Sequence, residues 1–113
     1  AEAAGYLAAI QARASLNRTE TQIRTQLMTL SPASFVQEVW RERIRELMFE
    51  NKIWYDITRT RQYPVSSGGQ VTFVPFVGAT NPWGKVFAEK NLLLPIPDDE
   101  MQRNPNLEQN TGY

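Results

Sequence analysis

The chain changes character near its middle, and this change constrains its fold more than any other feature of the sequence. Residues 1 to about 60 carry apolar side chains at helical spacing, whereas residues 61–113 contain six of the seven prolines and five of the six glycines. Proline lacks an amide donor and glycine favours turns, so long helices and large sheets are disfavoured in the second part. We therefore predict helices over residues 1–60, followed by an ordered, loop-rich segment over residues 61–113.

Three apolar repeats are expected in the helical part. The first helix is predicted to turn one face of small and aliphatic residues toward a neighbour, namely Ala3, Leu7, Ile10 and Ala14. A weaker repeat predicts a short second helix between residues 17 and 30, formed by Ile23, Leu27 and Leu30. The pair Ser31 and Pro32 then marks the start of the main helix, because serine caps helix amides and proline is tolerated in the first turn.

The main helix is predicted to continue to about residue 60 with apolar residues on two sides. One stripe contains Val36, Trp40, Ile44, Leu47 and Trp54. A second set, well round the helix, contains Phe35, Phe49, Ile53 and Ile57. A helix with two apolar sides needs neighbours on both, which favours a place within a larger helical array. For the same reason we do not expect the 113 residues to fold well alone.

A charged set lies between the two apolar stripes, at Arg43, Glu46 and Glu50. Spacings of three and four residues allow opposite charges to meet along a helix. These residues either form a solvated ion pair of small energetic value or a semi-buried structural network that a substitution would disrupt. Both alternatives are structural, and neither is catalytic.

The loop-rich part begins with a predicted turn at residues 66–69, flanked by extended chain, so at most a short hairpin is expected, and Pro75 confines it to an edge. A second turn, at residues 81–84, presents Trp83 among small neighbours. Trp83 either folds back onto the helices or offers its flat apolar face to a sugar or to another protein. Together with Tyr63 and Asn81, it is a candidate ligand-binding residue.

The last part of the chain is predicted to be a structural clasp. Residues 92–97 contain two prolines and should run extended in a groove. Acidic residues from Asp98 can begin a single helical turn, which Asn104 and Pro105 would end. The asparagines and glutamines that follow can hold the tail through bonds to the backbone.

Composition excludes several classes of function. The chain has no histidine and no cysteine, so the usual nucleophile–base pairs and thiolate metal sites cannot form, and we expect no enzyme, metal or cofactor. Its 12 basic and 12 acidic side chains balance, which makes nucleic acid an unsuitable partner. The opening residues read as the interior of a helix and lack an initiator methionine, which indicates a piece of a larger protein.

Four motifs in order carry a resemblance that covers nearly the whole chain. They are Arg41-Glu42-Arg43 with residues 46–50, Tyr55 to Arg59, the Leu-Pro-Ile-Pro element at 94–97 with Glu100, and Asn104-Pro105 with residues 109–113. In this order they resemble the carboxyl-terminal part of SusD/RagB proteins. The chain departs from the family where Asn51 replaces a usual glycine, Ile53 an arginine, and Thr111 a common proline.

The resemblance implies a mainly α-helical protein, part of an α-α superhelix, with tetratricopeptide-like repeats in an amino-terminal part that this segment lacks. It implies a lipoprotein on the outer face of the outer membrane, attached only through a lipid outside this segment. Its partner would be a SusC-like TonB-dependent transporter, and its ligand an oligosaccharide or, in some members, a peptide. A structural interaction module without a small ligand and a carboxylate-dependent hydrolase remain alternatives.

Overall fold

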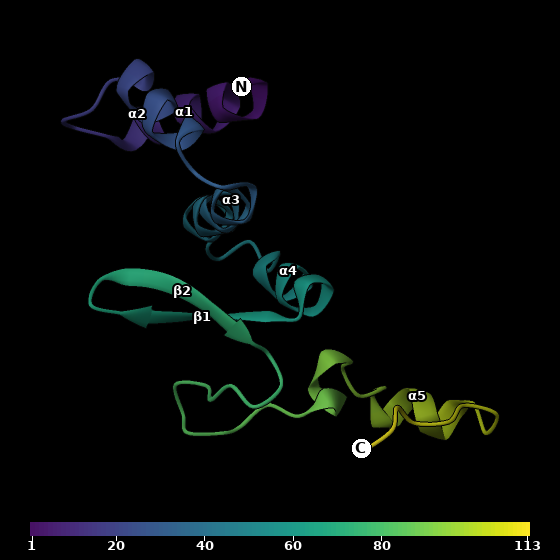
Figure 1. Ribbon diagram of the computed structural model, residues 1–113. Helices are drawn as coiled ribbons and strands as arrows, with labels where there is room; N and C mark the ends of the chain where they lie inside the picture. Colours follow the sequence, from purple (N-terminus) through teal and green to yellow (C-terminus); the bar gives the residue numbers. More distant parts are fainter. The chain divides into compact units, whose positions relative to one another are not determined.

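The computed structural model describes all of residues 1–113 (Figure 1). The elements in order are α1 (Glu2–Ala14), α2 (Glu20–Met28), α3 (Pro32–Glu46), α4 (Ile53–Thr60), β1 (Gln62–Ser67), β2 (Gln70–Pro75), η1 (Glu89–Leu92) and α5 (Asp98–Arg103). The prediction of a mainly helical chain with one short hairpin is confirmed. None of the helices combines the length and the apolar character that crossing a membrane requires. The chain forms two compact units, Ala1–Ile53 and Trp54–Tyr113, which are described separately.

The core of residues 1–53 lies where α1 packs against α2. Its buried members are Ala4, Leu7, Ala8, Ile23 and Leu27, and the partly buried Ala12, Phe35 and Val39 pack against them. The predicted α1 face was therefore wrong except at Leu7, because Ala3 and Ala14 are exposed and Ile10 is 41% exposed. Small side chains at positions 4 and 8 let the two helices approach closely, which favours the face that contains them.

Side-chain caps fix where α2 and α3 begin. The Thr19 hydroxyl accepts a hydrogen bond from the Gln22 amide, and the Gln22 side-chain oxygen accepts one from the Thr19 amide, which completes a capping box. Ser31 caps α3 through the amide of Ser34, with Pro32 in the first turn, as predicted.

The predicted single main helix is wrong, because α3 ends at Glu46 and α4 begins only at Ile53. Between them Phe49 and Asn51 adopt left-handed backbone conformations, with φ of 70° and 57°. Left-handed residues cannot continue a right-handed α-helix, so the helix must end before Phe49. Each predicted stripe is therefore divided between two shorter helices, and Leu47 and Phe49 lie in neither of them.

The second unit contains the hairpin β1–β2, which is antiparallel and pairs Tyr63 with Val74 and Ser67 with Gln70 (Figure 1). Its two-residue turn uses Gly68 and Gly69, with φ of 58° and 77°. Glycine adopts these values without a steric penalty, which suits a tight hairpin turn. The predicted short hairpin at this place is confirmed.

Aromatic rings form the core of residues 54–113. Phe76 is only 1% exposed and stacks on Phe87, with ring centroids 4.5 Å apart. Trp54 and Tyr63 meet Phe76 edge to face at 5.8 and 6.5 Å, and Tyr63 also lies 5.0 Å from Phe87. Offset and edge-to-face contacts of this kind add to the hydrophobic gain of burying the rings.

The tail is held by the side-chain bonds expected of a clasp. Gln109 accepts from the amide of Ile96 and donates to its carbonyl, both at 2.8 Å. Asn110 donates to the carbonyl of Leu94, and the hydroxyl of Tyr113 donates to that of Leu93. The ammonium of Lys90 lies 4.8 Å from the centre of the Tyr113 ring. These bonds attach the last residues to the extended segment that precedes α5.

Candidate functional site

The loop between Ala79 and Phe87 is a small ladder of backbone hydrogen bonds. Phe87 donates to the carbonyl of Ala79 at 2.8 Å, and Asn81 donates to the carbonyl of Lys85 at 2.8 Å. The two strands of the loop are anchored on the aromatic core where they begin and end. Phe87 belongs to that core, and the amide of Gly78 donates to the Phe87 carbonyl at 2.9 Å. The loop is therefore ordered by its own bonds and anchored on buried rings.

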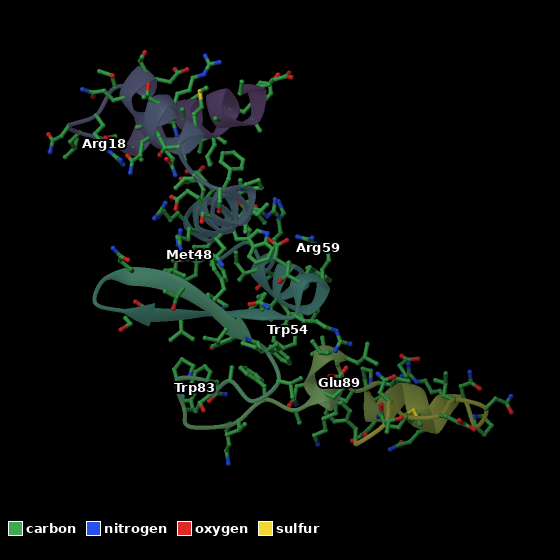
Figure 2. All side chains as sticks on the ribbon, in the orientation of Figure 1. Arg18, Met48, Trp54, Arg59, Trp83 and Glu89 are labelled. Carbon is green, nitrogen blue, oxygen red and sulfur yellow. The ribbon has the colours of Figure 1, made fainter.

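Trp83 lies at the tip of this loop with its side chain in solvent. It is 84% exposed, so it does not fold back onto the core of its unit. Figure 2 shows the labelled indole at the outer end of the loop that follows β2. A large ring held out by an ordered loop can bind an apolar surface while losing few internal degrees of freedom.

The side chain of Asn81 shapes the turn that carries Trp83. Its Oδ1 accepts hydrogen bonds from the amides of Trp83 and Lys85, at 3.0 and 2.9 Å. This leaves the Nδ2 group as the part of Asn81 not used by these two bonds. Tyr63 is half-buried among Phe76 and Phe87, beneath the loop. Of the three predicted ligand-binding residues, Asn81 and Trp83 thus share one turn, whereas Tyr63 contacts Phe87 at the base of the loop, and Trp83 is the most exposed.

The three residues of the predicted charged network lie on or beyond the last turns of α3. Glu46 forms an ion pair with Arg13 of α1, and Glu50 pairs with Lys52 at 2.8 Å. Arg43 lies on the exposed side of α3. The hydrogen bond and the charge of Glu46 raise the pKa of the Arg13 guanidinium, so this pair ties α1 to α3 as ions.

A second charged cluster, which the sequence analysis did not single out, lies between α1 and α3. Gln11 donates to Glu38 and to the buried Glu42, both at 3.0 Å, while Arg41 and Arg45 pair with the same two carboxylates. Burial favours a raised pKa for the Glu38 carboxyl, but the bonds from Arg41 and Gln11 and the nearby charges outweigh it and lower the pKa. The cluster is structural, because every carboxylate in it is engaged by a neighbour.

An open groove of about 1200 Å³ lies between α4 and the tail in residues 54–113. The two arginines that line it are already paired, since Arg59 binds Asp56 at 3.1 Å and Arg61 binds Glu89 at 2.7 Å. No group of three or more acidic side chains is placed to hold a metal ion. The Trp83 loop carries the more exposed aromatic ring, 84% against 72% for Tyr55 in the groove, and we take it as the candidate binding site.

The chain is similar to known proteins in both sequence and fold. It matches the SusD family over residues 1–113. A crystal structure of a SusD superfamily protein from Parabacteroides distasonis ATCC 8503 is 36% identical, with a TM-score of 0.70. That match covers 98% of this chain but 25% of the solved one, so the segment spans about a quarter of its neighbour's length. No curated protein matches significantly.

The family match extends over every residue of the chain, and the fold agrees with a solved member at 36% identity. Sequence and fold therefore lead to the same family, and the chain belongs to the SusD family.

Proposed function

We propose that the protein containing this segment binds a nutrient at the cell surface and delivers it to a SusC-like TonB-dependent transporter. The ligand is an oligosaccharide, and Trp83 is one of its contacts. Membership of the SusD family supports this general role. The observation that carries the assignment of Trp83 is its exposed ring on an ordered loop.

The chemistry of the loop suits a saccharide. The C–H face of a sugar is apolar and flat enough to pack on an indole, and amide groups bond to its hydroxyls. Trp83 supplies the ring, and the Nδ2 group of Asn81 is a donor on the same turn. Tyr63 supports the loop from within the aromatic core. A loop that is ordered before binding loses less entropy when the ligand arrives.

Most of the segment then acts as scaffold. The Glu38 and Glu42 cluster fixes α1 on α3, and the clasp fixes the tail. We place the lipid anchor and further ligand contacts in other parts of the protein. The protein would lie on the outer face of the outer membrane. The role is one of binding without catalysis.

The test is a calorimetric screen of the intact protein against oligosaccharides and peptides. Trp83→Ala should weaken binding of the best saccharide about tenfold or more, and Trp83→Phe should restore part of it. Val86→Ala is the matched control, since Val86 is an apolar side chain of the same loop and is 64% exposed. Equal affinities for Trp83→Ala and Val86→Ala would remove Trp83 from the site.

Three other outcomes would change the assignment. Robust peptide binding without saccharide binding would make the protein a peptide-binding member of the family. Lost stability with no ligand bound by any variant would favour a structural interaction module. Hydrolysis of a bound glycan during long incubation would indicate an enzyme, and we expect the glycan to be recovered intact.

A further inference from the structure

Lys85 differs from every other cation in residues 54–113 because nothing in the structure engages its ammonium group. Arg59, Arg61 and Arg103 pair with carboxylates. Lys90 bonds to the carbonyl of Gly112 and lies over the Tyr113 ring. Lys85 is exposed, and only its backbone takes part in hydrogen bonds. Its ammonium group therefore has no direct partner within this unit.

The surrounding sequence also lacks negative charge. No aspartate or glutamate occurs between Asp56 and Glu89. These two carboxylates are the partners of Arg59 and Arg61, so they are already neutralised. The loop thus carries a net positive charge. No unpaired carboxylate lies nearby in the sequence to form an ion pair with Lys85.

The geometry places this charge on the same turn as Trp83. The amides of Trp83 and Lys85 bond to one oxygen atom, Oδ1 of Asn81, at 3.0 and 2.9 Å. Gly84 between them has φ of 79°, which allows the chain to reverse within one residue. The aromatic ring and the ammonium group therefore leave the backbone from one tight, ordered turn.

We propose that Lys85 makes the Trp83 loop selective for an acidic saccharide, whose apolar face packs on Trp83 and whose carboxylate or sulfate lies beside the ammonium group. This inference rests on the proposed function. A neutral saccharide gains only the ring contact, whereas an acidic one gains an additional charge-assisted bond. Because the site is exposed, salt should weaken the additional bond.

The test compares the intact protein and its Lys85→Gln variant on matched ligands. The probes are uronic acid oligosaccharides, their neutral methyl esters and sulfated oligosaccharides of similar length, each measured by calorimetry at low and high salt. The matched control is Lys52→Gln, which removes one exposed lysine charge from residues 1–53. Trp83→Ala is measured in parallel.

The unaltered protein should bind the acidic form roughly two- to fivefold more tightly than its methyl ester, and Lys85→Gln should abolish that preference. Lys52→Gln should retain it, and high salt should reduce it. Whether uronate or sulfate is preferred identifies the acidic group. Binding that depends on Trp83 but is equal for both forms would overturn the role of Lys85 and leave the proposed function standing. No binding of any saccharide would overturn both.

Discussion

Removing the side chain of Phe76 tests the core on which the candidate site stands. Phe76 is 1% exposed, stacks on Phe87 at 4.5 Å and meets Trp54 edge to face at 5.8 Å. Truncating a buried phenylalanine to alanine costs about 3 to 5 kcal/mol, as lost burial plus a residual cavity. With three ring neighbours we expect Phe76→Ala to cost about 4 kcal/mol, the middle of this range.

The loss should be measured by chemical denaturation of the intact protein, followed by tryptophan fluorescence. Trp54, one of three tryptophans in the chain, touches the altered position directly, so its part of the emission reports the local transition. Val77→Ala is the matched control, because Val77 is the next residue and is 47% exposed. We expect it to cost less than about 1 kcal/mol. Phe76→Leu, which keeps most of the volume, should fall between the two.

The same substitution should affect ligand binding. Phe87 loses its stacking partner, and Phe87 forms the last rung of the Trp83 loop through its bonds with Gly78 and Ala79. Phe76→Ala should therefore weaken saccharide binding although it touches no ligand. A cost of less than about 1 kcal/mol, equal to that of Val77→Ala, would show that the rings do not form the core described.

Three further predictions concern other parts of the chain. The lowered pKa of Glu38 means that its ionised form stabilises the fold above its ordinary pKa of 4.5, and that this contribution is lost as the pH falls through the folded value. Glu38→Gln should accordingly flatten the acid side of the stability–pH curve measured by denaturation. Gln109→Ala should cost about 1 to 3 kcal/mol by breaking both bonds to Ile96, and the exposed Thr111→Ala almost nothing, in thermal unfolding. Asn51→Gly should be neutral or stabilising by up to about 1 kcal/mol, because φ is 57° there, and a clear loss of stability would contradict the left-handed assignment.

Features set by neighbouring residues could be predicted from the sequence. Ser31 and Pro32 begin α3, Gly68 and Gly69 form the hairpin turn, and α5 begins at Asp98. In each case the chemistry acts within a few residues, through a capping bond, a permitted backbone angle or the helix dipole.

Partners that lie far apart in the sequence could not be predicted. Helical spacing relates Glu46 to Arg43 but gives no indication of the ion pair between Glu46 and Arg13, 33 residues away. Gln11 likewise bonds to Glu42 across 31 residues. A single sequence identifies charges that share a helix face, whereas these pairs depend on which face α1 turns toward α3.

The α3–α4 break was missed because apolar periodicity does not show where one helix ends and the next begins. The apolar pattern continues through Glu46 and resumes at Ile53, so two helices resemble one. The only local signal was Asn51, a residue type that tolerates left-handed backbone. Phe49 gives no such signal, yet its φ is 70°.

The sequence predicted the position of Trp83 on a turn but not the exposure of its ring. Turn chemistry predicted the loop, but residue type alone left two alternatives for the ring. In the structure the loop is held by the side chain of Asn81, by backbone bonds and by Phe87, and the indole takes part in none of these bonds. Trp83 is thus not needed to hold the loop that carries it. A loss of ligand in Trp83→Ala without a loss of stability would therefore report a missing contact, whereas the same loss in Phe76→Ala would report a displaced loop.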